Sequence, residues 1–274
     1  MRRVTVPQRL FAAAGLLLAA LAQAQNDGFV APYVPTVEED VELMLDVAGV
    51  RPDDYVIDLG SGDGRIAIAA ARRGALAHGV ELDPDLVELA RANAAESGVS
   101  ERVAFLQGDI FAVDIDRATV VTLYLFPDAN LMLRPKLLAE LRPGTRVVSN
   151  SFHMGEWQPD VHDMSARSSG GVLLWIVPAR IGGEWLLEID DGERLAFSVR
   201  QQFQDIDLRY IGAEAGLASA AATLTGDRIR FEARSEAVRY SFDGEIDNES
   251  MHGYVHIERE SGRIVAAWRA VRND

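Results

Sequence analysis

The chain has 274 residues, no cysteine and a formal net charge of −15. The lack of cysteine excludes disulfides, thiolate metal sites and a cysteine nucleophile, and the negative charge argues against a basic face for nucleic acid or anionic lipid. With 48% hydrophobic and 25% charged residues, the composition indicates one large or two small globular domains rather than a disordered chain.

The first 24 residues have the pattern of an export signal. Three arginines within the first nine residues precede an uncharged run over residues 10–22, which is short for a bilayer span. Ala22-Gln23-Ala24 then fits a small-x-small cleavage site. We expect a cleaved signal peptide over residues 1–24 and a periplasmic or secreted protein with no stable membrane span. An uncleaved N-terminal anchor is the alternative.

From about residue 38 to residue 176, helical stretches alternate with apolar strand-like runs. The predicted helices are EEDVELMLDVAGV (38–50), GRIAIAAARRG (64–74), PDLVELARANAAESG (84–98) and NLMLRPKLLAEL (130–141). The predicted strands are DYVIDL (54–59), LAHGVEL (76–82), RVAFLQGD (102–109), ATVVTLYLF (118–126) and TRVVSNSF (145–152), followed by an antiparallel hairpin of DVHDMSA (160–166) and GVLLWIV (171–177). This alternation predicts an α/β fold with a doubly wound, mainly parallel sheet.

The hydrophobic pattern changes after Pro178: short runs in which apolar and polar residues alternate are separated by turn sequences. These runs are EWLLEI (184–189), RLAFSVRQQFQ (194–204), DLRYIGA (207–213), RIRFEAR (228–234), AVRYSFDGEI (237–246), MHGYVHIER (251–259) and RIVAAWRA (263–270). They predict an antiparallel meander that curls into a small barrel or sandwich. We therefore expect an α/β domain over residues 25–179 and a β domain over residues 180–274.

A glycine loop follows the first predicted strand and opens the next helix, which is the general arrangement for holding a nucleotide. Its sequence, Gly60-Ser61-Gly62-Asp63-Gly64, is not followed by the lysine and the serine or threonine that a phosphate loop has after its last glycine. Asp58 and Asp63 would repel a pyrophosphate, but they suit a cofactor with a positive centre. The loop therefore favours S-adenosylmethionine (SAM) over a dinucleotide.

Two further acids close the following strands. Glu81 ends the second strand, where a carboxylate can accept hydrogen bonds from both ribose hydroxyls of a nucleoside. Asp109 ends the third strand and is placed to accept a bond from the adenine amino group. The carboxyl ends of parallel strands meet at one edge of a sheet, so these acids should lie together there.

Several motifs resemble the motifs of known protein families. VIDLGSGDGRI, GVELDPD and QGDI resemble the SAM-binding motifs of seven-strand Rossmann-like (class I) methyltransferases, over about residues 56–152. APYVPT, GSGDGRIAIAAA, LYLFPDANLMLRPKLLAEL and RVVSNSFHMGEW resemble, more closely, a family of mitochondrial and bacterial protein-lysine methyltransferases, over about residues 31–157. The export signal and the β region are not part of the mitochondrial pattern.

The resemblance implies a set of cofactor-binding residues. Tyr33, Pro35 and Thr36 would pack over the cofactor as a lid. The pocket itself would be lined by Asp58, Gly60, Ser61, Gly62, Glu81 and Asp109. The implied methyl acceptor is a protein lysine, with a small molecule or a lipid left open and nucleic acid not expected.

The acceptor side is less defined. LYLFP occupies the place of an Asn-Pro-Pro-Tyr-like motif, and without the asparagine a planar amide or base is disfavoured as acceptor. Tyr124, Phe126 and Pro127 are candidates for an acceptor channel, with core packing as the alternative. His153 is as readily structural as catalytic, and the histidines lack the spacing of metal ligands. No catalytic residue is assigned.

These observations lead to an exported SAM-dependent methyltransferase that works by direct displacement. Methyl transfer from a sulfonium needs alignment, exclusion of water and a deprotonated acceptor, but no dedicated nucleophile on the protein. The alternative is an envelope protein that binds SAM or a nucleoside without catalysis.

Overall fold

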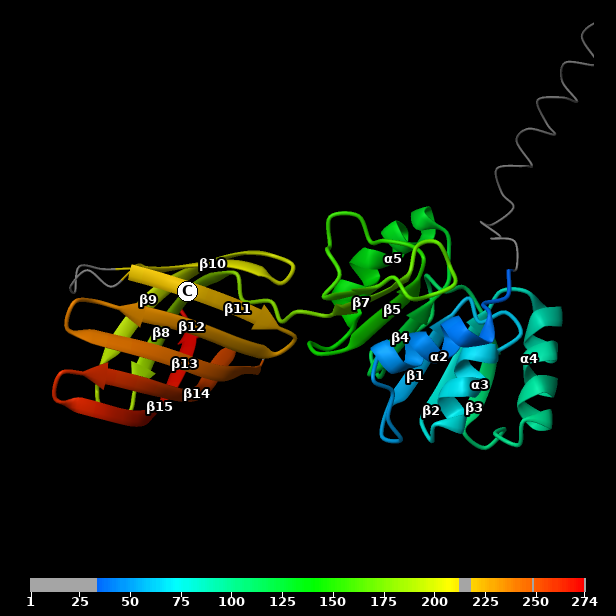
Figure 1. Cartoon of the computed structure of the whole chain (residues 1–274), viewed down its shortest axis with the longest axis horizontal. Coiled ribbons are helices and arrows are strands. Elements are labelled where there is room, and N and C mark those ends of the chain that lie inside the picture. Colours follow the sequence, from blue (N-terminus) through cyan, green and yellow to red (C-terminus); the bar gives the residue numbers. More distant parts are fainter. Residues whose placement is uncertain (1–33, 212–217, 248, 274) are drawn as a thin grey trace, which may run out of the picture. The chain divides into compact units, whose positions relative to one another are not determined.

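The computed structural model describes residues 34–211, 218–247 and 249–273 (Figure 1). The expected signal peptide over residues 1–24 and the candidate lid residue Tyr33 lie outside these ranges. Within the described residues, no helix combines the length and apolar character needed to cross a membrane.

The first part of the described chain forms a seven-stranded sheet in the order β3-β2-β1-β4-β5-β7-β6. Strands β1 to β5 pair in parallel, and β7 runs antiparallel to both β5 and β6. The strands are β1 (Tyr55–Leu59), β2 (Leu76–Glu81), β3 (Val103–Gln107), β4 (Val120–Leu123), β5 (Arg146–Asn150), β6 (Val161–Asp163) and β7 (Val172–Ile176). The predicted Rossmann-like sheet and its closing hairpin are confirmed.

Helices cover both faces of this sheet (Figure 1). They are α2 (Glu38–Val47), α3 (Arg65–Arg72), α4 (Pro84–Glu96) and α5 (Pro127–Glu140). The α4 helix begins where the Asp83 side chain accepts the Asp85 N–H at 2.9 Å, a normal N-terminal cap. The α5 helix continues through Pro135, in agreement with the helix predicted over residues 130–141.

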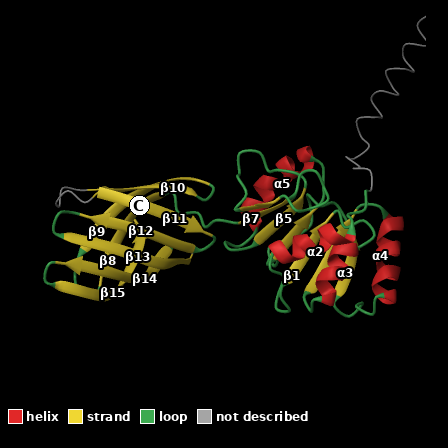
Figure 2. Ribbon diagram, in the orientation of Figure 1, coloured by secondary structure: helices red, strands yellow, loops and turns green. Residues whose placement is uncertain are grey.

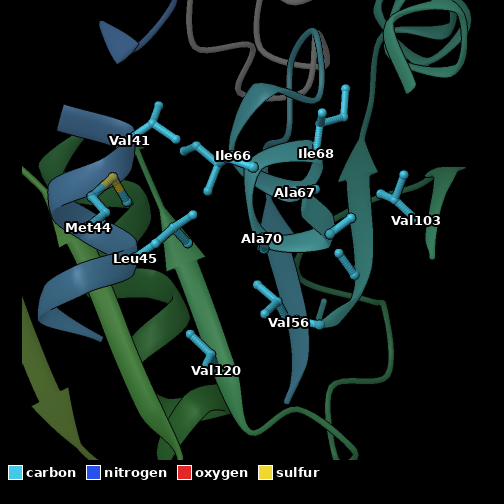
Figure 3. Close-up of a cluster of buried hydrophobic side chains, with 14 of the residues drawn as sticks. Val41, Met44, Leu45, Val56, Ile66, Ala67, Ile68, Ala70, Val103 and Val120 are labelled. Atoms are coloured by element: carbon cyan, nitrogen blue, oxygen red, sulfur yellow. The ribbon is translucent and has the colours of Figure 1, made fainter. Parts of the chain in front are cut away.

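The sheet has a separate hydrophobic core on each face. On one face Val41, Met44 and Leu45 of α2 lie with residues of α3 and the strands, as Figure 3 shows. Residues of α4 belong to the same core. On the other face Leu133 and Leu137 of α5 pack with sheet residues that include Trp175 and Leu123. Packing on both faces leaves the strand ends as the accessible part of the sheet, and the carboxyl ends carry the candidate site.

The second part is an eight-stranded antiparallel sheet in the order β10-β9-β8-β15-β14-β13-β12-β11, built of strands alone (Figure 2). The strands are β8 (Gly183–Ile189), β9 (Arg194–Gln202), β10 (Asp205–Ile211), β11 (Ala218–Thr225), β12 (Arg228–Arg234), β13 (Val238–Asp247), β14 (Ser250–Arg259) and β15 (Gly262–Arg272). Pairing of β15 with β8 curls the sheet into a nearly closed barrel, in which β10 and β11 lie near each other without a hydrogen-bonded ladder among the described residues. Its core includes the aromatic residues Phe197, Phe231, Tyr240, Phe242 and Trp268.

The sequence predicts seven strands in this part, and the structure adds an eighth, β11. Its sequence, ASAAATLT, is rich in alanine, which has low strand propensity, so its pattern does not indicate a strand. Backbone pairing with β12, and not the local strand propensity, makes this segment a strand. The register of the pairing shifts at a bulge between Ser219 and Ala222.

Candidate functional site

The glycine loop between β1 and α3 depends on glycine at named positions. Gly60, Gly62 and Gly64 have φ angles of 80°, 51° and 82°, in the left-handed region that glycine adopts without strain. A Cβ atom at Gly60 would lie 2.7 Å from Cδ2 of Leu125, and one at Gly64 would lie 2.5 Å from Cζ of Phe105. The loop backbone is therefore packed directly against the ends of the neighbouring strands.

Asp58 lies at the base of this loop and is almost fully buried. Its Oδ1 accepts a hydrogen bond from Oγ1 of Thr122 at 2.6 Å, whereas Oδ2 makes no well-formed hydrogen bond within the described residues. Burial raises the pKa of Asp58 to about 7, and the charges of Glu81 and Asp63 add to the increase. A buried carboxyl with a spare oxygen is suited to a cationic ligand, which would favour its ionised form.

The second acid of the loop has a partner of its own. Asp63 forms an ion pair with Arg65, with 2.6 Å between Oδ2 and Nη2. The same guanidinium donates through Nη1 to the backbone oxygen of Thr36 at 2.6 Å. This contact ties Thr36 to the loop, and Thr36 is buried while Pro35 is exposed. The predicted lid position is thus anchored for Thr36, and Arg65 is the residue that anchors it.

Glu81 closes β2 and organises three backbone groups. Its carboxylate accepts the N–H of Gly62 at 2.9 Å, of Leu82 at 2.8 Å and of Asp83 at 3.0 Å. The backbone oxygen of the same residue accepts the N–H of Gly108 at 2.9 Å. Glu81 therefore connects the glycine loop to the end of β3.

Asp109 and Ser61 complete the predicted cofactor side. Asp109 is exposed after β3, and its Oδ1 accepts the Phe111 N–H at 2.9 Å. Ser61 is buried, and its Oγ has no hydrogen-bond partner within the described residues. Buried polar atoms normally have a partner, so the unpaired oxygens of Ser61 and Asp58 indicate a place for a polar ligand.

The candidate acceptor residues follow β4 and lie beside a ring that the sequence did not point to. The Phe152 ring lies 6.3 Å from the Tyr124 ring and 6.3 Å from the Phe126 ring, measured between centroids. Pro127 is the exposed first residue of α5. The structure thus places Tyr124 and Phe126 together at the carboxyl edge and adds Phe152 to them.

Asn130 is a buried polar residue that the sequence motifs did not indicate. Asn130 is fully buried in α5, and its Nδ2 donates to Oγ of Ser149 at 3.2 Å and to the backbone oxygen of Phe152 at 3.1 Å. Its position on the same helix face as Leu133 and Leu137 was the available signal. A polar residue within an apolar stripe usually has a specific hydrogen-bonding role.

The end of β5 has an unusual backbone. Ser151 has a φ of 70°, which is uncommon for a residue with a side chain, and its N–H donates to the Gly171 oxygen at 2.8 Å. A Cβ atom at Gly170 would lie 2.1 Å from the Ser151 oxygen. Close backbone packing therefore holds this turn, and strained residues of this kind concentrate at functional sites.

The two conspicuous residues after β5 have different environments. His153 is exposed, and its ring lies 5.5 Å from the His162 ring. Trp157 is fully buried, stacks 5.9 Å from Phe203 and donates from Nε1 to Oε1 of Gln204 at 2.9 Å. Trp157 is therefore a packing residue that contacts the β9–β10 turn.

The sequence of this chain is similar to those of known methyltransferases. Residues 58–161 match the family model described as the ANTKMT methyltransferase domain. The chain is 49% identical over 130 residues to a protein-lysine N-methyltransferase of Saccharolobus islandicus, covering 47% of this chain and 81% of that protein. It is 43% identical over 129 residues to the mouse adenine nucleotide translocase lysine N-methyltransferase, of which it spans 56%.

A solved structure is similar to about half of the chain. The crystal structure of an RNA methyltransferase from Salinibacter ruber in complex with S-adenosyl-L-homocysteine is 52% identical, with a TM-score of 0.52. The match covers 54% of this chain and 96% of that one. The family model ends at residue 161, before the β barrel begins.

Proposed function

We propose that this chain, which belongs to the Rossmann-like (class I) protein-lysine methyltransferase family, transfers methyl groups from SAM to the side-chain amine of a protein lysine. It is a SAM-dependent methyltransferase, and SAM is its cofactor. The observation that carries the lysine acceptor is the 49% identity to an archaeal protein-lysine N-methyltransferase of which the chain covers 81%.

The residues present fit the cofactor. The unpaired oxygens of Asp58 and Ser61 offer acceptors for a ligand with cationic and polar groups. Glu81 would hold the ribose, and Asp109 would hold the adenine amino group. Thr36, fixed through Arg65, would cover the pocket.

We propose a direct displacement for the transfer. When bound, SAM supplies a methyl group on a cationic sulfur. The protein's part is to hold the acceptor amine in line, to exclude water and to let the amine lose its proton. Apolar surroundings lower the pKa of a lysine amine, because burial disfavours the charged form. Tyr124, Phe126 and Pro127 would form the channel that supplies such surroundings.

The test uses the purified chain, radiolabelled SAM and a cell-envelope extract. Label that survives nuclease, is lost with protease and appears as methyl-lysine after acid hydrolysis is the expected result. Label that is removed by nuclease would instead favour an RNA acceptor, in line with the description of the Salinibacter ruber protein. Binding of SAM with no transfer to any fraction would contradict the proposal and favour a binding protein without catalysis.

We also propose that the protein is exported, with a tethered form as the alternative. The support is the sequence pattern of residues 1–24: basic start, apolar run and small-residue cleavage site in the order that signal peptides have. N-terminal sequencing of the native protein tests this. A mature start at Gln25 in the periplasmic fraction is expected, and full-length protein in the cytoplasm would contradict export.

A further inference from the structure

We propose that the β barrel takes part in methyl transfer by holding residues 151–158, here called the post-β5 segment, in place beside the candidate site. The contact is made by the turn between β9 and β10, where Phe203 and Gln204 reach this segment. The inference rests on the proposed function and adds a part to it, because the family model ends at residue 161, before the barrel begins. Phe203 and Gln204 are positioning residues, which act through the segment and not on the cofactor or the acceptor.

The post-β5 segment starts at the candidate site. It leaves the carboxyl end of β5, next to the parallel strand β4. The Phe152 ring lies 6.3 Å from the Tyr124 ring, and Nδ2 of the buried Asn130 donates to the Phe152 oxygen at 3.1 Å. The first residues of the segment are therefore fixed by the α/β domain, and a movement of the rest would be passed to them along the backbone.

The other end of the segment is held by the barrel, which belongs to the same compact unit, Pro35–Asp274. Oε1 of Gln204 accepts a hydrogen bond from Nε1 of Trp157 at 2.9 Å, and Nε2 of Gln204 donates to the Gln158 oxygen at 2.9 Å. The Phe203 ring stacks on the Trp157 ring, with 5.9 Å between centroids and 18° between planes. One amide and one ring of the barrel therefore bind two consecutive residues of the segment.

The middle of the segment is packed between α5 and the same turn. Nη1 of Arg134 donates to the Met154 oxygen at 2.8 Å, and the Arg134 guanidinium lies 5.7 Å from the centre of the Phe203 ring. A cation within about 6 Å of an aromatic face is attracted to it. A Cβ atom at Gly155 would lie 2.8 Å from Cδ2 of Leu131, so the segment backbone is in close contact with the helix. Arg134 therefore connects the turn to the segment a second time.

The burial of Trp157 depends on both parts of the chain. Trp157 is fully buried, and Nε1 of Trp175 in β7 donates to its backbone oxygen at 2.8 Å. The turn supplies the stacked ring of Phe203 and the Gln204 oxygen that accepts from the indole N–H. A buried indole N–H normally has a hydrogen-bond partner. Without the turn, this donor would lose the acceptor that it has among the described residues.

The sequence of the turn is poorly suited to turning. Gln202 pairs with Asp205, so Phe203 and Gln204 form a two-residue hairpin loop. Such loops favour glycine or asparagine where φ is positive, but φ is 56° at Phe203. The loop between β11 and β12 has Gly226, with a φ of 60°, as its first residue. Bulky residues with a positive φ are uncommon and concentrate at functional sites, so the Phe203 ring is explained by the surface that it touches and not by the turn.

A Gly-Ser loop in place of Phe203-Gln204 tests the proposal. Glycine at the first position suits the positive φ, so the double variant Phe203→Gly/Gln204→Ser should leave the barrel folded and remove both contacts. Amide hydrogen exchange is measured by mass spectrometry on the full chain saturated with S-adenosyl-L-homocysteine. Residues 154–158 should exchange roughly 10- to 100-fold faster than in the wild type, the size expected for the loss of two hydrogen bonds and a ring contact.

The same variant is then assayed for methyl transfer. With saturating radiolabelled SAM and a cell-envelope extract, the initial rate of protein labelling should fall roughly 10- to 100-fold, because small displacements near a reacting centre have effects of this size. The calorimetric affinity for S-adenosyl-L-homocysteine should stay within about twofold of the wild type, because the turn contacts the post-β5 segment and not the glycine loop.

Two single variants serve as controls. Phe203→Tyr keeps the ring and should restore wild-type exchange and wild-type labelling. Gln202→Ala, a change at an exposed position of the same hairpin, should leave both unchanged. If the double variant does not fold, Gln204→Ala removes the two hydrogen bonds alone and should show the same changes with a smaller size.

Two kinds of result would overturn the proposal. One is unchanged exchange over residues 154–158, or an unchanged labelling rate, in the folded double variant. The other is faster exchange throughout β1 and β4, or a lost affinity for S-adenosyl-L-homocysteine, because the effect of the turn would then not be confined to the segment.

Failure of this proposal can be told apart from failure of the proposed function. If the wild type labels protein lysine and the double variant labels it at the same rate, the barrel does not position the site and the proposed function stands. If the wild type labels no protein at all, the proposed function fails. The exchange measurement needs no acceptor, so in that case it still decides whether the turn holds the segment.

Discussion

Replacing Glu81 with alanine tests the cofactor site at its most connected residue. The carboxylate accepts three backbone N–H groups at 2.8–3.0 Å, including that of Gly62 in the glycine loop. In the complex it would also accept the ribose hydroxyls. A hydrogen bond to a charged group contributes about 1.5–3 kcal/mol, so losing the ribose contact alone should weaken binding roughly 10- to 100-fold. Loss of the Gly62 contact would loosen the loop and add to this effect.

The assay is isothermal titration calorimetry with S-adenosyl-L-homocysteine, supported by thermal melts of each variant. Glu81→Gln keeps the shape and one acceptor oxygen, so its affinity should lie between those of the wild type and Glu81→Ala. Glu88→Ala removes a surface carboxylate that pairs with Arg91 on α4, and it should leave the affinity unchanged. A folded Glu81→Ala protein that binds S-adenosyl-L-homocysteine as tightly as the wild type would refute the assignment of Glu81.

Three further outcomes follow from the same geometry. The pKa of Asp58 is raised to about 7 from 3.8, so between these values the folded protein holds a proton that the unfolded chain has released, and the free energy of unfolding should fall as pH rises from about 4 to about 7 and stay low above that. Chemical unfolding at pH 5 and pH 8 should show this difference, and Asp58→Asn should reduce it. An identical difference in the variant would contradict the raised pKa of this carboxyl. Gly60→Ala should lose S-adenosyl-L-homocysteine binding because its Cβ would lie 2.7 Å from Leu125, while Gly98→Ala, with a φ of 68° but nothing within 4 Å of its Cβ, should cost only about 1–2 kcal/mol of stability and keep the affinity. A fragment of residues 182–274 should give a β-type circular dichroism spectrum and a cooperative melt, and a disordered fragment would show that the β region depends on the rest of the chain.

Local patterns predicted much of the fold. The alternation of apolar runs and amphipathic helices is a property of neighbouring residues, so the parallel sheet, the four helices and the face formed by Val41, Met44 and Leu45 could be anticipated. Glu81 could also be anticipated, because the end of a strand next to a glycine loop has a defined place in the sheet. The contact between Glu81 and the Gly62 N–H confirms that they are neighbours.

Contacts between distant residues could not be predicted in the same way. Asn130 reaches the Phe152 backbone across 22 residues, and Trp157 reaches Gln204 across 47. Neither partner follows from a local motif, because each depends on how a helix or turn packs on the finished sheet. The strand β11 was missed for a related reason: its partner β12, not its own alanine-rich sequence, makes it a strand.

The missing ladder between β10 and β11 has a consequence for how the barrel behaves in a crowded solution. Among the described residues each of these strands has one edge without a ladder partner, and although the two strands lie near each other, an unpaired edge that becomes exposed can recruit a strand from another molecule and start aggregation. The β10 edge carries the exposed charges of Asp205, Asp207 and Arg209, and the bulge between Ser219 and Ala222 interrupts the register of β11. Charge on one edge and irregular spacing on the other are protections against intermolecular pairing. A substitution that flattened β11 or neutralised β10 should therefore be noticed first as lower solubility, before any loss of methyl transfer.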